Sequence, residues 1–253
     1  MNLIASSLAV VTTFSTPFSQ IRLDMMALTP KEVETKLDTI ILFTPSDKDG
    51  NPLSFEFDVE GNKKNIYFAA FSPTAINFLN TKVISQSIDK DTKYTYSPKS
   101  LSKFNSLIEI QKQQTKKKLF DVIYIPDPDQ AAISKKLLLE QGYKKEGLDN
   151  LVQNNPMIFC PNPTVTATEN NTKSTYIPCS TDYTTMKGLI DQVKIKKKYP
   201  WSKVKEPQVM AIPLSQFITT LKTSEEDNIK DIKVIPTPSS LKVINQINSK
   251  KNK

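Results

Sequence analysis

A strand followed by two closely spaced prolines occurs twice in the sequence, and this repetition constrains the fold more than any other feature. The segment Val122–Pro128 (VIYIPDP) reappears 110 positions later as Ile232–Pro238 (IKVIPTP). Self-similarity at a fixed offset is the sequence signature of one structural unit used more than once. We therefore predict that the chain folds as two tandem copies of a single α/β unit.

Other segments correspond at nearly the same offset. Ile66 matches Tyr176 and Leu79 matches Leu189 at 110 positions. The offset is 116 between Ile41–Pro45 and Met157–Pro161, and 113 between Leu101–Phe104 and Leu214–Phe217; changes in loop length account for this drift. Strand, helix cap and apolar helix stripe thus recur in the same order.

The predicted fold class is α/β (α+β), with two tandem pseudo-symmetric repeats that each place about three helices on a mixed sheet. Turns at Asp49-Gly50-Asn51 and Glu60-Gly61-Asn62 separate apolar runs and predict a three-stranded meander over residues 40–70. Ser72 followed by Pro73 predicts the start of a helix, because serine caps helices and proline suits the first helical position. Gly142 is expected to end a helix over residues 128–141.

These signals divide the chain into five parts. Residues 1–27 form a candidate signal or N-terminal targeting segment, residues 28–143 the first repeat, and residues 144–155 a polar linker. Residues 156–247 form the second repeat, and residues 248–253 a basic tail.

The N-terminal stretch from Leu3 to Phe14 is apolar and resembles the central part of a secretory signal. No Lys or Arg precedes it, so a truncated start, a lost basic region and a mature N-terminal segment remain alternatives. It is too short to span a bilayer, and no later segment reaches the length that a spanning helix needs.

The net charge of +8 comes almost entirely from lysine, since Arg22 is the only arginine. Proteins that recognise nucleic acids normally use the planar guanidinium group of arginine for bidentate contacts to bases or phosphates. We therefore expect no nucleic-acid partner. Basic clusters at 116–118, 194–198 and 250–253 are typical of solvated surface. Their alternative role is docking to acidic partners or peripheral contact with an anionic membrane.

The sequence contains no histidine, which excludes catalytic triads and zinc sites that depend on imidazole. Its five glycines form no phosphate-binding loop. Asp47 and Asp49 fit a turn better than a calcium loop, and Asp129, whose counterpart in the repeat is Ser239, is expected to cap a helix. We therefore predict no catalytic, metal or cofactor-binding residues, no cofactor and no enzymatic activity.

The two cysteines, Cys160 and Cys179, flank an Asn-rich turn around residues 169–173. If this turn closes a hairpin, the thiols lie opposite each other and form a disulfide in an oxidising compartment. In another register they are two ordinary buried thiols.

The chain is rich in aromatic residues, most of which are expected to form the core. The alternative is that a curved sheet leaves a groove for apolar segments of another chain. The candidate groove residues are Phe43, Phe55, Phe68, Phe71, Phe159 and Tyr176.

Several motifs, in this order, resemble the Tic twenty-two-like family, a component of the chloroplast protein-import machinery with cyanobacterial and plastid-encoded relatives. The resemblance covers roughly residues 28–247. The matching motifs are Lys36–Asp38, Ile41–Thr44, Asp49–Leu53, Ile177–Pro178, Val209–Leu221 and Ile235–Ser239 before Leu241.

The resemblance implies a two-lobed α/β protein with apolar pockets, located in the plastid intermembrane space, at the envelope or in the cyanobacterial periplasm. Such proteins look like import factors that bind precursor or unfolded polypeptides in a chaperone-like way beside a translocon or an Omp85-type channel. We expect a non-enzymatic import or translocation factor. The alternative is a structural subunit of an envelope or photosynthetic membrane complex.

Overall fold

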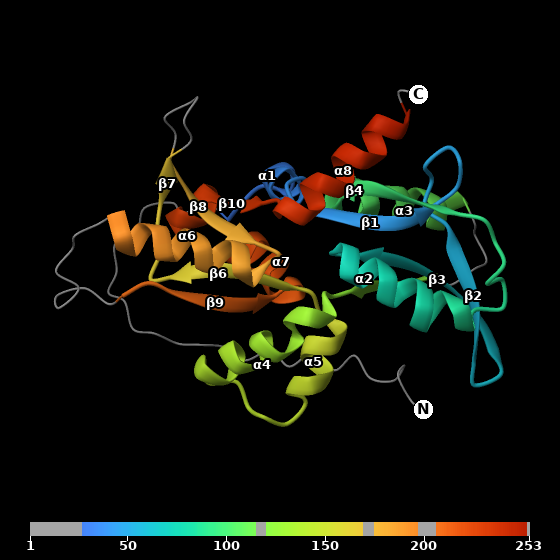
Figure 1. Ribbon diagram of the computed structural model, residues 1–253, viewed down its shortest axis with the longest axis horizontal. Helices are drawn as coiled ribbons and strands as arrows, with labels where there is room; N and C mark the ends of the chain where they lie inside the picture. The colour runs from blue at the N-terminus through green and yellow to red at the C-terminus, as the bar shows by residue number, and fades with distance from the viewer. Residues whose placement is uncertain (1–26, 115–119, 169–174, 197–205, 252–253) are drawn as a thin grey trace.

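The computed structural model describes residues 27–114, 120–168, 175–196 and 206–251. It is an α+β fold built on two mixed sheets that lie side by side along the long axis of the molecule (Figure 1). Residues 1–26 of the predicted targeting segment, the cluster Lys116 to Lys118 and the end of the basic tail fall outside the described residues.

The first sheet contains β1 (Ile41–Ser46), β2 (Ser54–Val59), β3 (Asn62–Ala70), β4 (Thr95–Ser100) and β5 (Phe120–Ile125). Strand β3 pairs antiparallel with β1 and β2 and parallel with β5, and β4 adds antiparallel to β1. Three antiparallel strands are therefore present over residues 40–70, but the predicted meander is wrong, because β3 and not β2 pairs with both of the other strands.

The second sheet contains β6 (Met157–Asn162), β7 (Ala167–Thr168), β8 (Thr175–Ser180), β9 (Gln208–Pro213) and β10 (Ile232–Ile235). Strand β8 pairs antiparallel with β6 and β7 and parallel with β10, while β9 adds antiparallel to β6. Strand order and direction are the same as in the first sheet.

The strand registers also correspond at the offsets seen in the sequence. Tyr67 pairs with Val122 and Ile177 pairs with Ile232, a shift of 110 on both strands (177 − 67 and 232 − 122). Phe43 pairs with Pro98, and Phe159, which lies 116 positions later, pairs with Ala211, 113 positions after Pro98. The two halves therefore share one pairing scheme residue by residue.

The helices cover both faces of the sheets. A π-turn, η1 (Leu79–Val83), and a 3₁₀ turn, η2 (Ile84–Gln86), continue α2. Two further 3₁₀ turns, η3 (Pro128–Gln130) and η5 (Asp227–Asp231), precede α4 and β10. The α-helices are α1 (Pro30–Leu37), α2 (Pro73–Phe78), α3 (Leu101–Gln114), α4 (Ala131–Glu140), α5 (Leu148–Asn154), α6 (Tyr183–Lys196), α7 (Leu214–Thr223) and α8 (Pro238–Lys251).

One central core joins the halves. It combines Leu37 of α1 and Phe104 of α3 with Phe217 of α7 and strand residues from both sheets, including Leu42 and Ile158. Two smaller cores lie on the other faces, one under α2 in the first half and one under α4, α5 and α6 in the second. Burial of apolar area on both faces of each sheet is the main stabilising term.

Helix α4 packs on the sheet of the other half. Its sequence position is in the predicted first repeat, yet its Leu138 belongs to the second-half core. Gln141, directly after the helix, accepts a 2.8 Å bond from the Ala211 N–H of β9 and donates a 2.9 Å bond to the Ala211 carbonyl. The predicted linker over residues 144–155 holds α5, which packs beside α4 in the same core. The closing helix of the first half thus belongs spatially to the second.

Four helical segments begin directly after strands β3, β5, β8 and β10, and their capping residues are spaced by 55 positions: Ser72, Asp127, Asp182 and Thr237. Asp127 accepts a 3.0 Å bond from the Asp129 N–H, so Asp127 is the cap. The prediction that Asp129 and Ser239 are the caps is therefore wrong. In each half the capping residue lies two positions earlier in the sequence, at Asp127 and Thr237. Side chains at the residue before the first helical position can reach these free N–H groups.

Among the helices of the described residues, none combines the length and the apolar character needed to cross a membrane.

Candidate functional site

The structure places five of the six candidate groove residues in the interior. Phe43 and Phe55 are 0% exposed, Phe68 and Phe159 are 1% exposed, and Phe71 is 4% exposed. Four of these residues belong to the three core clusters. Phe71 belongs to the central core, Phe159 to the second-half core, and Phe55 and Phe68 to the first-half core. They fill separate cores and do not line one open groove.

The sixth candidate, Tyr176, is half-buried on β8. The Lys233 ammonium group lies over its ring, with Nζ 5.3 Å from the ring centroid. This cation–π contact joins β8 to β10 and belongs to the packing of the second sheet. Tyr176 therefore does not extend a binding surface that the phenylalanines would form.

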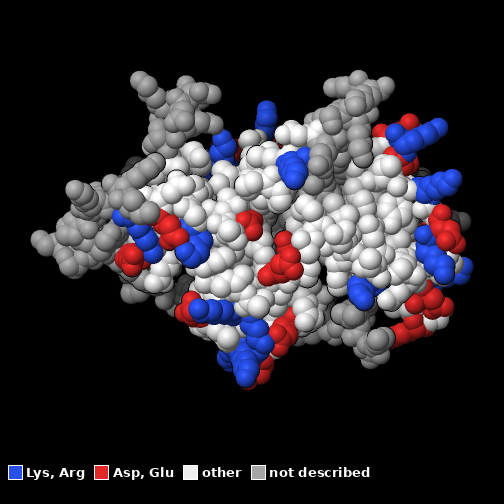
Figure 2. Space-filling view, in the orientation of Figure 1, with Lys and Arg blue, Asp and Glu red and all other residues white. Residues whose placement is uncertain are grey.

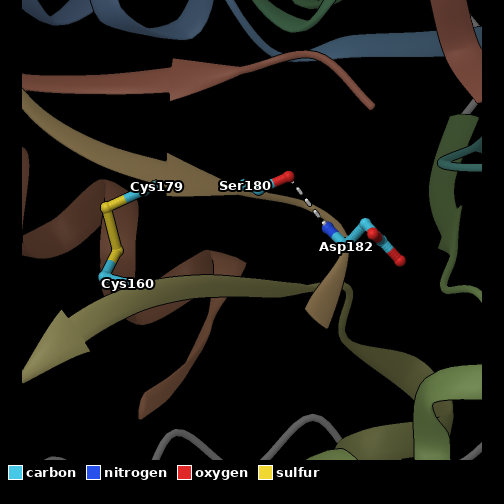
Figure 3. Close-up of a disulfide and its surroundings, with 4 residues drawn as sticks. All are labelled: Cys160, Cys179, Ser180 and Asp182. Atoms are coloured by element: carbon cyan, nitrogen blue, oxygen red, sulfur yellow. Dashed lines mark hydrogen bonds between the residues drawn. A yellow bond between two sulfur atoms is a disulfide. The ribbon is translucent and has the colours of Figure 1, made fainter. Parts of the chain in front are cut away.

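Cys160 of β6 and Cys179 of β8 form a disulfide, with an S–S distance of 2.07 Å and a Cα–Cα distance of 4.4 Å (Figure 3). Because Phe159 pairs with Ser180, the two cysteines are directly opposite each other on neighbouring antiparallel strands. The exposed fractions are 3% for Cys160 and 0% for Cys179, so the bond lies in the central core. Of the two alternatives for these thiols, the structure has the bonded one.

The first half has an unbonded pair at the corresponding place. Cys160 corresponds to Thr44 at the offset of 116, and Cys179 corresponds to Ala69 at the offset of 110. Both Thr44 and Ala69 are 0% exposed, and the pairing of Phe43 with Ala70 puts them opposite each other as well. The disulfide thus replaces a threonine–alanine contact in an otherwise shared arrangement.

Exposed apolar side chains occur on α2 and at the start of α8, where Lys242 is an exposed charge next to Leu241. No Asp, Glu, Lys or Arg occurs between residues 65 and 81, and Figure 2 shows a wide area without charged side chains over α2. Phe78 of α2 is 42% exposed and Leu241 of α8 is 45% exposed, and the two helices are in contact. We call this surface, defined by Phe78, Leu241 and Ile244, the α2–α8 face.

A small cluster of hydrogen-bonded polar side chains lies at the π-turn that follows α2. Asn80, in the π-turn after α2, accepts hydrogen bonds from Tyr94 Oη at 2.9 Å and from Tyr96 Oη at 2.7 Å. Phe55 packs edge-on against Tyr94, with ring centroids 5.3 Å apart. Burial raises the pKa of Tyr96, and Tyr94 beside it raises that pKa further, so both phenols stay protonated and can donate.

The raised pKa of Tyr96 predicts a loss of stability at alkaline pH. The unfolded chain ionises this phenol near its ordinary pKa of 10.0, whereas the folded chain resists ionisation. The stabilisation is complete below that pH and falls as the pH rises toward the folded-state pKa. Urea unfolding at several pH values should show a smaller alkaline loss for Tyr96→Phe than for the wild type. Equal losses in the two proteins would contradict this assignment.

A narrow cleft lies at the seam between the two halves. It has space for roughly one water molecule, which is too small for a cofactor or a polypeptide segment. Gln130 crosses the seam beside it: its Nε2 donates to Asp182 Oδ1 at 2.9 Å, and its Oε1 accepts from the Tyr183 N–H at 2.8 Å. The lining residues include Phe71, Pro126, Gln130, Ser134, Met157 and Phe159.

No catalytic arrangement emerges from the part of the chain that the structure describes. Within it, no three His, Cys, Asp or Glu side chains gather in a way that could hold a metal ion. Asp127 and Asp182 serve as helix caps, and Asp47 closes its own loop by accepting bonds from the Asp49 and Asn51 N–H groups. The most distinctive surface is therefore the α2–α8 face.

The sequence contained only an indirect signal for this face. The residues Ala75 and Leu79 define the buried stripe of α2, and Phe78 lies beside that stripe, where a soluble helix usually carries a polar residue. A large aromatic residue off the buried stripe, within a long stretch free of charge, is the pattern that could have indicated it.

The sequence matches no family model and no curated protein. Two solved structures are similar to the fold over nearly their whole length. Anabaena Tic22 (protein transport) superposes with a TM-score of 0.63 at 18% identity, covering 87% of this chain and 97% of that chain. Tic22 from Plasmodium falciparum superposes with a TM-score of 0.58 at 15% identity, covering 86% and 98%.

Proposed function

The chain has a Tic22-like fold, and from this premise we propose that it is a non-enzymatic protein-transport factor that binds unfolded or precursor polypeptides. The observation that carries the proposal is the α2–α8 face, where Phe78 and Leu241 are each exposed by more than two fifths and no acidic residue lies on either helix. Exposed apolar surface of this kind marks interaction sites on soluble proteins.

The face suits partners that are apolar and variable in sequence. Apolar contacts are non-directional, so they require no fixed pattern of donors and acceptors in the partner. Folded partners bury their large apolar side chains, whereas unfolded chains expose them. The face therefore favours extended or partly folded polypeptides over native surfaces. A translocon or Omp85-type channel as a second partner follows from the family resemblance alone.

The disulfide supports an oxidising compartment. Such bonds persist in secreted and periplasmic environments and are rare where thiols are kept reduced. The Cys160–Cys179 bond is buried in the central core. We propose a location in the cyanobacterial periplasm or the plastid intermembrane space, with the protein free in that space or peripherally attached to the membrane.

The proposal is tested by asking whether the full chain suppresses aggregation of an unfolded outer-membrane protein. The double variant Phe78→Asp/Leu241→Asp should lose most of this activity, with about tenfold weaker binding, because a loss of ~1.4 kcal/mol in binding free energy corresponds to a factor of ten. Light scattering measures the aggregation, and fluorescence anisotropy with a labelled unfolded client measures the affinity.

Ile110→Asp is the matched control. Ile110 is 49% exposed on α3, which packs in the central core on the opposite side of the first sheet from α2, so it undergoes the same chemical change away from the face. It should leave suppression unchanged. If the wild type suppresses no aggregation and instead co-purifies in one fixed complex, the chain is a structural subunit of an envelope or photosynthetic membrane complex.

A further inference from the structure

The cleft at the seam lies where the carboxyl ends of three strands meet. Phe71 directly follows β3, Pro126 follows β5 and Thr181 follows β8, and all three residues line the cleft. They are spaced by 55 positions (126 − 71 and 181 − 126), as are the helix caps next to them. Because the strand ladders stop here, buried polar groups at this place need partners from outside the sheets.

Ser134 of α4 brings a hydroxyl group to the same cleft. The residue is 0% exposed, and its Oγ has no hydrogen-bond partner among the residues that the structure describes. A helical serine often bonds to the carbonyl four positions earlier, as Ser106 does with the Ser102 carbonyl at 3.1 Å. Ser134 does not make the corresponding bond to Gln130. A buried hydroxyl group is costly to leave unpaired, so this one indicates a further partner.

The size and the chemistry of the cleft both fit a water molecule. The space is that of roughly one water, and an apolar group there would leave the Ser134 hydroxyl group unpaired. Among the lining residues, Pro126 and Pro156 carry carbonyl acceptors but no N–H, and Thr181 carries a second hydroxyl group. A buried water typically makes about three hydrogen bonds, and these residues supply enough polar groups for them.

We propose that one buried water molecule is a structural part of the seam, held by the Ser134 Oγ and by polar groups at the ends of β5 and β8. Pro126 belongs to the first half and Thr181 to the second, so this water joins the two halves. The counterpart of Ser134 at the offset of 110 is Ile244, which has no hydroxyl group, so α8 does not repeat the site. The proposal goes beyond the role in transport and stands whether or not the chain binds unfolded polypeptides.

Ser134→Ala should lower the melting temperature by about 2–4 °C, the shift expected when a chain of this size loses one buried hydrogen bond. If the hydroxyl group has no partner, the same substitution removes an unpaired buried group and introduces a better helix former, so the melting temperature should rise. Differential scanning calorimetry measures the sign of the shift. A melting temperature equal to or above that of the wild type would overturn the proposal.

Ser106→Ala is the matched control. It makes the same substitution in α3, where the hydroxyl group bonds within its own helix to the Ser102 carbonyl. This variant should keep or raise the melting temperature, because alanine favours the helix and the lost bond is local. A fall as large as that of Ser134→Ala would overturn the proposal, since the loss of a serine from any helix would then explain the shift.

Ser134→Val tests for the water itself, because its methyl groups fill the cleft. Magnetic relaxation dispersion of water oxygen nuclei counts long-lived buried waters, and the folded variant should hold one fewer than the wild type. A high-resolution crystal structure of the wild type should show a water oxygen about 2.6–3.0 Å from Ser134 Oγ. Equal counts in the two folded proteins, or a crystal structure with Ser134 bonded to the Gln130 carbonyl and no water, would overturn the proposal. If Ser134→Val fails to fold, the wild-type crystal structure decides alone.

Discussion

Phe43→Asp should abolish folding. Phe43 lies in β1 between two partner strands, paired with Ala70 on one side and Pro98 on the other, and is 0% exposed. Truncation of a buried phenylalanine costs about 3–5 kcal/mol, and a carboxylate buried without a partner adds several more. A domain is stabilised by only about 5–15 kcal/mol in total. Circular dichroism should therefore show an unfolded or molten chain.

Phe78→Asp provides the matched comparison, because the same substitution is made at a side chain that is 42% exposed. Urea unfolding of this variant should differ from the wild type by less than about 1 kcal/mol. Comparing the two variants distinguishes an interior position from a surface position. A loss of client binding can be assigned to the substituted side chain only in the variant that stays folded. A folded, stable Phe43→Asp protein would show that this residue lies outside the core.

Reduction of the disulfide should lower the melting temperature by about 6–12 °C. The bond closes a loop with a sequence separation of 19, for which the loss of loop-closure entropy in the unfolded chain corresponds to about 3 kcal/mol. For a chain of this size, each kcal/mol shifts Tm by roughly 2–4 °C. Thermal melts with and without reductant, followed by circular dichroism, measure the difference.

The double variant Cys160→Thr/Cys179→Ala is the control. It copies Thr44 and Ala69, which occupy the corresponding positions of the first half and are fully buried there. This protein should fold without the bond and melt at the same temperature whether reductant is present or not. A wild-type melting temperature that does not respond to reductant would show that the bond adds no stability.

Sequence reasoning predicted where the strands lie because those signals are local, but it predicted the wrong order of the first three strands. Proline follows β5, β6 and β10 directly, and Gly50 and Gly61 adopt the positive φ angles of 82° and 79° that their turns require. The offsets between repeats then fixed which strands correspond. Ser72 caps α2 as predicted, with a 3.0 Å bond from the Ala75 N–H. These features depend on residues close together in the chain.

The candidate site was harder to predict because exposure depends on contacts between distant segments. A phenylalanine on a strand has the same local pattern whether a helix or solvent covers it. Helices cover both faces of each sheet, so Phe55, Phe68 and Phe159 became core. The sequence likewise predicted a helix over residues 128–141 but gave no information about which sheet would cover it.

The packing of α4 on the other half has a consequence for biosynthesis. Gln141 leaves the ribosome 70 residues before Ala211, its partner in β9. Until that strand is made, the apolar stripe of α4 has no sheet to cover it, and the nascent front portion cannot reach its final state. An isolated fragment ending near Tyr143 should for the same reason expose this apolar stripe, aggregate and bind chaperones. The two halves should therefore be expressed and degraded together as a single folding unit.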